Sequence, residues 1–475
     1  MMQRAVVPSL VAFLLAGPAA AQQVLKVPAQ YKTIQAAIDA ASHKDTVLVA
    51  PGTYPENIDF KGKAISVSGE YGATVTTLSG TGKQTGAVVT FASGEGKDSV
   101  LEGFTVTNGG PGIVITNSGP TVRFNHITGN QSVGNGGGLR ISGTPTNYAL
   151  IMHNEITENE VVSAPFNYQL SGGGLRCVRA ILANNVIRRN RVIGADFASS
   201  PWQLGGGVWS QDSIIVNNLI LFNWVQLGAT VVGRPQSCGG GLHTASTDVV
   251  INNTIWGNAV GYGTLWGTFE GGGVYTNGAR VVNCIIRENT AWTCHEISGT
   301  ATFCNIKGGH PGIGNIDADP QFTADGTFHL APDSPCRDTG SGGYLNFSAS
   351  DFEWDDRGWG SGVDIGADEF APHVYHFGET RRGKTFTLTV LGEPGKTAWL
   401  GYAAKPLQTP IPIPGSGLLW LDPWTLRLMP LGTLPPSGRA ELLLSIPVSA
   451  PLVLVPFQAL LGAELTRPEL IQVVP

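Results

Sequence analysis

Five glycine triplets divide the middle of the chain into units of nearly constant length. They begin at Gly136, Gly172, Gly205, Gly239 and Gly271, which gives spacings of 36, 33, 34 and 32 residues. Each triplet is followed directly by leucine or valine. A period of this size is typical of a solenoid, in which each unit stacks on the next because it cannot bury a core alone.

A second motif, Asn-x-[Ile/Leu]-x-x-Asn, recurs with the same period. A sixth copy, which ends at Asn289, has Cys284 in place of the first asparagine. The apolar runs between the motifs are too short for helices, so we expect strands that pair with the equivalent run of the next coil. The sequence therefore predicts an all-β fold, a right-handed parallel β-helix that forms a single-stranded solenoid. Its isoleucine column should point inward, and its asparagines should form ladders at the turns.

The N-terminal residues predict export. Residues 1–21 combine Arg4, a short apolar stretch and an Ala-x-Ala site, which is typical of a signal peptide. We expect a secreted protein, extracellular or on the cell surface. No transmembrane segment should remain after cleavage, because prolines interrupt the later apolar stretch at 442–461. A short amphipathic helix within 33–41 should cap the first coil, followed by a strand at 46–49 and a turn at 51–54.

The composition and its changes along the chain divide the mature protein into three parts. We place the capped β-helix at 22–330, its closing segment at 331–372 and a separate, sandwich-like all-β module at 373–475. The last part has 8 Lys/Arg against 6 Asp/Glu and contains alternating strand-like runs. The 64 glycines favour tight turns over helices. A net charge of −6 gives no reason to expect nucleic acid as a partner.

The six cysteines are too few for disulfides to be the main stabilising feature of this long chain. Cys294, Cys304 and Cys336 lie close together near the end of the solenoid, where one local bridge can form, but the sequence does not choose among the possible pairings. A zinc site is less favoured because no CxxC or paired Cys/His spacing is present.

Two parts of the chain resemble a known family. Residues 31–41 and the run TVLVAPGTYPENI at 46–58 resemble the opening of pectate-lyase-like right-handed β-helix proteins. The runs GNIDADPQF, SPCRDTG and VDIGADEF, which begin at 314, 334 and 363, are similar to the closing segment of exported bacterial β-helix proteins with variable surface anchors. Together these resemblances cover most of residues 24–372 and imply a β-helix there. The C-terminal module resembles the modules appended to many unrelated exported bacterial proteins, which implies sorting, or attachment to a cell surface or to export machinery. The strand and turn motifs of pectin methylesterases are absent, which argues against an esterase.

The residue after the leucine or valine that follows each triplet forms the most informative column. Alternation along a strand directs these residues outward, at about 4.8 Å per coil. Guanidinium groups suit carboxylate or sulfate groups, and sugar rings stack on aromatic rings. The column therefore predicts a binding surface for an acidic polysaccharide, unless five outward positions acquired such residues by chance. The column consists of Arg140, Arg176, Trp209, His243 and Tyr275.

The loops before the triplets contain many aromatic residues, Trp202 and Trp266 among them. Because these loops leave successive coils at the same point, they should wall one side of the column. Their rings either contribute to the ligand site or pack on each other and cover the solenoid.

A catalytic site is a weaker interpretation because carboxylates are sparse along the coils. Asp212 and Asp248 come nearest to an acid/base pair, with His243 or Arg176 as a further candidate base. Solvated turn residues are the favoured interpretation of the two aspartates.

A Ca²⁺ site is equally weakly supported. Asp351, Asp355 and Asp356 offer oxygen ligands within one loop, but without the EF-hand spacing. Asx turns that close the last coils are the favoured explanation, and no cofactor is required by the sequence.

Three functions follow from these patterns. The first is a non-catalytic protein that binds extracellular polysaccharide, and the second is a polysaccharide lyase or glycoside hydrolase that acts in the same groove. The third is a purely structural surface protein. The sparse carboxylates favour the first.

Overall fold

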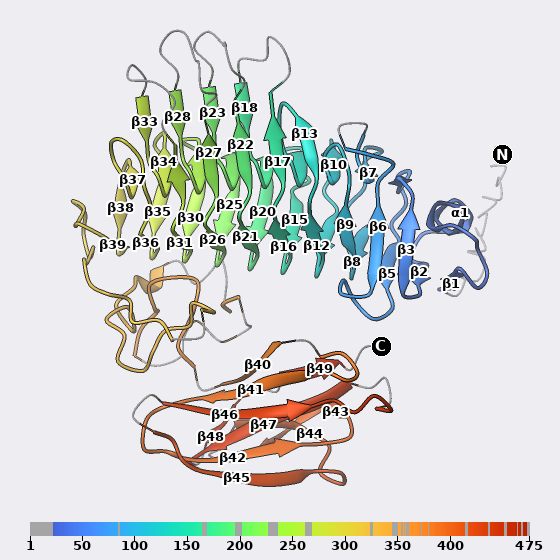
Figure 1. Cartoon of the computed structure of the whole chain (residues 1–475), viewed down its shortest axis with the longest axis vertical. Coiled ribbons are helices and arrows are strands. Elements are labelled where there is room, and N and C mark those ends of the chain that lie inside the picture. Colours follow the sequence, from blue (N-terminus) through green and yellow to red (C-terminus); the bar gives the residue numbers. More distant parts are fainter. Residues whose placement is uncertain are drawn as a thin grey trace, which may run out of the picture.

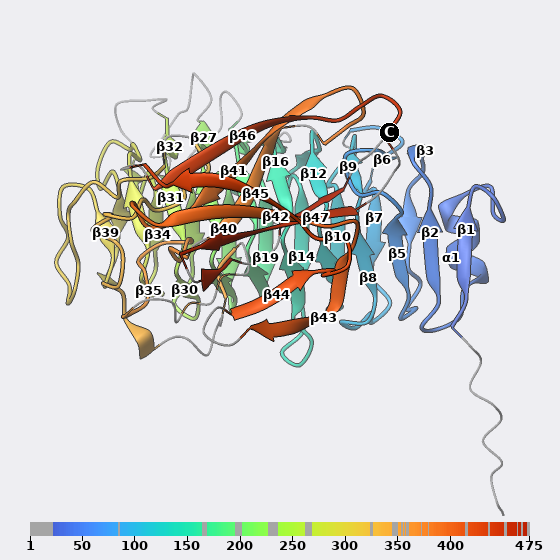
Figure 2. The same ribbon diagram turned by 90° about the horizontal axis from the view of Figure 1, so that it is seen from below.

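The computed structural model describes residues 22–472 except 84–85, 164–168, 195–201, 227–235, 262–267, 324–325, 344–349, 353–354, 356, 358–360, 372, 379, 414–416, 436–437, 451–453, 463 and 467–468. Its main body is a right-handed parallel β-helix, and its C-terminal part is a separate module of antiparallel sheets, so the predicted fold class is confirmed. The module lies alongside the solenoid (Figures 1 and 2).

Three long parallel sheets form the solenoid, with one strand of each sheet in most coils. The first sheet contains β1 (Val24–Val27), β2 (Thr46–Val49), β5 (Ser66–Gly69), β8 (Val100–Glu102), β11 (Thr121–Arg123), β15 (Ala149–Met152), β20 (Ala180–Ala183), β25 (Ile214–Val216), β30 (Val249–Ile251), β35 (Arg280–Val282) and β38 (Ala301–Thr302). The second contains β3 (Gly52–Pro55), β6 (Thr76–Ser79), β9 (Thr105–Thr107), β12 (His126–Thr128), β16 (Glu155–Thr157), β21 (Val186–Arg188), β26 (Leu219–Leu221), β31 (Thr254–Trp256), β36 (Ile285–Arg287) and β39 (Asn305–Ile306). The third contains β4 (Ile58–Asp59), β7 (Val89–Phe91), β10 (Ile113–Thr116), β14 (Leu139–Ser142), β19 (Leu175–Val178), β24 (Val208–Gln211), β29 (Leu242–Thr244), β34 (Val274–Thr276) and β37 (Ile297–Ser298).

Two shorter parallel sheets stand out from the solenoid between the second and third sheets; we call this pair the fin. The fourth sheet contains β13 (Gln131–Val133), β17 (Glu160–Val162), β22 (Arg191–Ile193), β27 (Trp224–Gln226) and β32 (Ala259–Val260). The fifth contains β18 (Gln169–Ser171), β23 (Trp202–Leu204), β28 (Gln236–Cys238) and β33 (Thr268–Glu270).

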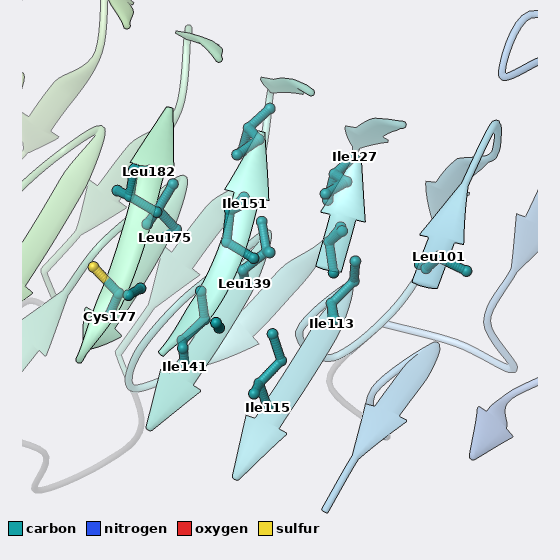
Figure 3. Packing of buried hydrophobic residues seen from close by; sticks show 14 of the residues in the cluster. Leu101, Ile113, Ile115, Ile127, Leu139, Ile141, Ile151, Leu175, Cys177 and Leu182 are labelled. Carbon is teal, nitrogen blue, oxygen red and sulfur yellow. The ribbon is translucent and has the colours of Figure 1, made fainter. Parts of the chain in front are cut away.

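The interior of the solenoid is a continuous stack of apolar side chains. The predicted isoleucine column is confirmed, since Ile127, Ile156 and Ile187 pair in register and are fully buried. Figure 3 shows leucines and isoleucines of neighbouring coils, such as Leu139 and Leu175, pointing into the same space. Each coil buries its apolar side chains against the neighbouring coils, so the core forms by stacking and not by closure of a barrel.

The predicted asparagine ladders are present at two turns of the successive coils that carry the motif. Asn154 Oδ1 accepts hydrogen bonds from Asn125 N at 3.0 Å and Asn125 Nδ2 at 3.1 Å, and the pattern repeats from coil to coil. In the first ladder Cys284 takes the place of an asparagine, and its Sγ accepts a hydrogen bond from Asn253 N at 3.4 Å. The second ends in Glu296, which accepts a 2.7 Å bond from Asn289 Nδ2. The asparagine side chains supply hydrogen-bond partners for buried backbone N–H and C=O groups. Without partners, these groups would lower the stability of the fold.

The glycine triplets are required by close contact between coils as well as by backbone geometry. Gly205, the first of its triplet, has φ +67, a conformation that glycine adopts without strain. A Cβ on Gly206 would lie 2.4 Å from the carbonyl oxygen of Gly240 in the next coil. No other residue type fits there.

The predicted cap is confirmed as helix α1 (Ile34–Ala40), which buries Ile34, Ala37 and Ile38 against the first coil. Glu56 accepts hydrogen bonds from the backbone of Ile34 and Gln35 at its N-terminus. The strand at 46–49 is also confirmed, whereas the turn expected at 51–54 is wrong. Strand β3 covers 52–55 there because Gly52 to Pro55 pair in register with β6.

The segment after the last coil folds back along the outside of the solenoid. Its buried Arg357 donates to Asn217 Oδ1 at 3.0 Å, and Ala367 N donates to Thr254 Oγ1 at 3.0 Å. Leu219 and Leu221, which point outward from the second sheet, are buried in a cluster with Ala367. The closing segment therefore covers this part of the second sheet.

The C-terminal module is built from antiparallel strands around a core of its own. Phe386, Leu388, Leu400 and Ala459 belong to that core. The stretch 442–461, which the sequence predicted to be strands, supplies parts of two of them. The strands are β40 (His373–Gly378), β41 (Thr385–Leu391), β42 (Thr397–Tyr402), β43 (Pro406–Ile413), β44 (Gly417–Leu421), β45 (Arg427–Thr433), β46 (Arg439–Ser445), β47 (Leu454–Leu461), β48 (Glu464–Leu465) and β49 (Glu469–Gln472).

The six cysteines are free thiols, and five of them are buried. Cys304 lies beside Cys284, and its Sγ accepts Cys284 N at 3.3 Å. The expected local bridge among Cys294, Cys304 and Cys336 is therefore not formed. Within the described ranges, no helix is both long and apolar enough to span a bilayer.

Candidate ligand-binding site

The fin forms the wall of the candidate site. Its two sheets enclose a small apolar core that includes Val161, Leu170, Val192 and Phe269. The sequence predicted aromatic loops at this point, and the structure shows that the bases of these loops are paired strands. Phe269 belongs to the interior of the fin, and Trp266 lies outside the described residues. Because the fifth sheet leads directly into the triplets, the fin meets the third sheet along an inside corner.

The five column residues line this corner in strict register. The Cα partners of Arg176 are Arg140 in β14 and Trp209 in β24, and the pairing continues through His243 to Tyr275. The leucine or valine before each of them is fully buried, so the alternation inferred from the sequence is correct.

The aromatic members of the column stack on one another. The guanidinium of Arg176 lies 4.3 Å from the centre of the Trp209 ring. The Trp209 and His243 rings are nearly parallel at 6.4 Å, and the His243 and Tyr275 rings at 5.0 Å. Each ring face that points at a neighbouring residue of the column is therefore occupied by that neighbour.

The fin covers the middle of the column. Leu204 and Cys238, from strands β23 and β28, form an apolar cluster with Trp209, which is only 9% exposed. Neither residue was predicted from the sequence. Their signal was the constant position directly before each triplet, where β18, β23 and β28 end. Trp202 lies two residues before Leu204 on β23; it is 48% exposed and faces solvent.

The positive charge of the corner has no counter-ion among the described residues. Arg140 is exposed and Arg176 is half-buried, and neither pairs with a described carboxylate. Burial lowers the pKa of Arg176, and the neighbouring Arg140 acts in the same direction. Glu270, near the other end of the column, accepts a 3.0 Å hydrogen bond from Ser298 Oγ. The corner is therefore cationic at the end nearer the N-terminus.

The histidine of the column is poorly suited to proton transfer. Burial lowers the pKa of His243 to about 4, so its ring is neutral at physiological pH. Its Nδ1 and the Nε1 of Trp209 are buried and have no hydrogen-bond partner among the described residues. A general base at neutral pH works best with a pKa near the operating pH.

The two aspartates considered for catalysis have separate structural roles. Asp212 lies 3.2 Å from Arg179 in an ion pair. Asp248 is 1% exposed and accepts bonds from Ser213 N at 2.7 Å and Ser210 Oγ at 2.8 Å, so the expectation of a solvated turn residue is wrong for it. Burial raises the pKa of Asp248 to about 6. Its buried carboxylate therefore stabilises the turn between Ser210 and Ser213.

The acidic segment near the end of the chain binds its own backbone. Asp351 accepts bonds from Asp355 N at 2.8 Å and Glu369 N at 2.9 Å, four and eighteen residues further along the chain. These bonds differ from those of the Asx turns that the sequence favoured, in which the side chain binds the backbone two residues on. Asp355 is buried, and Asp356 lies outside the described residues. No group of three or more potential metal ligands occurs in the part of the chain that the structure describes.

Comparison with known proteins adds no relative: no protein-family model and no curated protein matches this chain. The fold and site define a right-handed parallel β-helix with a fin and a charged inside corner. The function is therefore argued from this geometry.

Proposed function

We propose that this protein is an exported, non-catalytic β-helix protein that binds an acidic polysaccharide along the corner between the fin and the third sheet. We further propose that it is a distant member of the pectate-lyase-like family, exported through the signal peptide at 1–21. One observation carries the binding proposal: Arg140 and Arg176 are neighbours in register and have no carboxylate partner in the described structure.

Two adjacent guanidinium groups repel each other unless an anion lies between or over them. Arg176 is held in place by the Trp209 ring and is partly desolvated, so its orientation is largely preorganised. A carboxylate or sulfate group can bind both residues with paired hydrogen bonds. A uronate or sulfated sugar fits the cationic end, while the exposed Trp202 offers a ring face to a neighbouring sugar.

The enzymatic alternative has less support in the same corner. A lyase or hydrolase requires a base or a pair of carboxylates that faces the substrate. His243 is neutral and its Nδ1 is buried, and Asp248 is committed to a turn. The purely structural alternative leaves the two unpaired arginines unexplained.

Affinity for polygalacturonate, alginate and a neutral glucan tests the proposal. The parent protein should bind the two polyuronates and not the glucan, and Arg140→Gln with Arg176→Gln should weaken binding by about 100-fold, as expected for the loss of two charge-assisted contacts. The matched control is Arg191→Gln, which removes an exposed arginine paired with Glu160 on the fin.

The same mixtures decide between binding and catalysis. The polymers should keep their length and gain no unsaturated ends during incubation with Ca²⁺. Shortened or unsaturated products would establish the enzymatic alternative. Equal affinity of the double variant and the parent would remove the corner as the site.

A further inference from the structure

The C-terminal module carries an exposed tryptophan at the turn between β44 and β45. Trp424 is 94% exposed and Leu428, at the start of β45, is 60% exposed. Water contact over a whole indole is unfavourable, and tryptophan at such a tip is typical of an interaction surface.

The turn holds Trp424 in a defined position. Asp422 Oδ1 accepts Trp424 N at 3.2 Å, and Asp422 Oδ2 accepts Thr425 Oγ1 at 3.2 Å. The Thr425 hydroxyl in turn accepts Ala404 N at 3.1 Å, which ties the turn to the chain after β42. The indole therefore projects from a turn that hydrogen bonds hold in one conformation. Because the turn is already ordered, little further conformational entropy is lost on binding.

The residues around the tip are positively charged. Lys405 is exposed, and its carbonyl oxygen accepts Asp422 N at 3.4 Å, which places it beside the turn. Arg427 is exposed and pairs across the strands with Tyr402, which is 40% exposed. Neither cation has a carboxylate partner in the described structure. The module also has 8 Lys/Arg against 6 Asp/Glu, a formal charge of +2, whereas the whole chain carries −6.

We infer that this tip, formed by Tyr402, Lys405, Trp424, Arg427 and Leu428, binds an anionic lipid surface. Tryptophan and tyrosine favour the boundary between lipid headgroups and acyl chains. Lysine and arginine beside an apolar tip are attracted to anionic headgroups. The only carboxylate in the turn, on Asp422, is occupied by the turn itself, so the charged side chains that the tip offers to a partner, Lys405 and Arg427, are both cationic. A lipid surface therefore fits the tip better than a glycan does.

Sedimentation of the mature protein with lipid vesicles tests this inference. The protein should pellet with vesicles of phosphatidylglycerol mixed with phosphatidylcholine and stay in solution with phosphatidylcholine alone. Trp424→Ala should lower vesicle binding by about tenfold, since binding depends on the apolar area inserted. The double variant Lys405→Gln with Arg427→Gln should lower it similarly, and added salt should weaken the parent.

Trp292→Ala is the matched control, because it removes another exposed tryptophan, on the solenoid, and should leave vesicle binding unchanged. Trp424 has almost no contacts, so its variant should keep the thermal unfolding midpoint of the parent. The inference is overturned if anionic vesicles do not bind the parent, or if Trp424→Ala binds them as well as the parent. It is equally overturned if Trp424 mediates retention on an insoluble neutral polysaccharide without vesicle binding. None of these results depends on the solenoid corner.

Discussion

The outer faces of the second and third sheets are built from the same alternating strands, yet they have different environments. On the second sheet, the outward residues Leu219, Leu221 and Ile285 are 4%, 5% and 0% exposed because the closing segment covers them. On the third sheet, Arg140 remains exposed and its neighbours form a stack with unpaired charge. Apolar outward residues therefore indicate a face that the chain covers itself. The exposed Arg140 lies on the part of the third sheet that remains open to a partner.

Arg357 provides the largest test of the covered face. Its guanidinium is fully buried, donates to Asn217 Oδ1 at 3.0 Å and lies 3.7 Å from Glu369. We expect Arg357→Met to lower the free energy of unfolding by about 3–5 kcal/mol, since it leaves buried acceptors and a carboxyl group unpaired. Thermal and urea unfolding measure the loss.

The matched control is Arg123→Met, which removes a partly exposed ion pair with Glu102 and should cost under about 1 kcal/mol. A small effect of Arg357→Met would mean that the closing segment is held to the second sheet mainly by its apolar contacts.

A pair of truncations compares the two faces directly. Leu221→Ala should lower the free energy of unfolding by about 2–4 kcal/mol, because it opens a cavity beneath the closing segment. Arg140→Ala, at an outward position of the third sheet, should change it by less than about 0.5 kcal/mol. Similar losses from both substitutions, measured by urea unfolding, would remove the distinction between a covered and an open face.

The two faces should also respond to pH in opposite directions. In the closing segment, burial raises the pKa of Glu369 to about 9 and that of Asp364 to about 6. Their raised values favour the folded state at low pH, so this contribution is lost as the pH rises from about 4.5 towards 9. At the corner, burial lowers the pKa of His243 to about 4, so its contribution is lost as the pH falls from about 6.5 towards 4.

Amide hydrogen exchange, read separately in each segment, distinguishes these responses. After correction for the intrinsic pH dependence of amide exchange, residues 363–370 should exchange faster as the pH rises. Residues in β29 should exchange faster as the pH falls. Glu369→Gln should flatten the first response alone, and His243→Gln the second alone. A uniform response in both segments would show that the whole solenoid opens as one unit.

The sequence predicted the solenoid well because its repeat places each residue by register alone. Leu139, Leu175 and the isoleucine column follow from period and alternation, which are local properties. The burial of Leu219 by the closing segment could not be predicted in this way. Ala367, which packs with Leu219, is far from it in sequence and belongs to no repeat. The stacking of Arg176 on Trp209 agrees with a coil-to-coil ladder of cations and aromatic rings. The burial of Trp209 under Leu204 was missed because side-chain orientation at a corner depends on both sheets.

The smallest expected effect concerns the first asparagine ladder, at the turn between the first and second sheets. Cys284 occupies an asparagine position, where its Sγ accepts Asn253 N at 3.4 Å but lies 4.0 Å from Asn253 Nδ2, against 3.0 Å for the corresponding bond between Asn218 and Asn253. Thiols are weak acceptors, so Cys284→Asn should raise the free energy of unfolding by about 0.5–1.5 kcal/mol. Cys284→Ala is the control and should lower it. Because the position is buried between the sheets, a loss of stability in Cys284→Asn would show that the last coils lack the room that earlier coils provide for an amide.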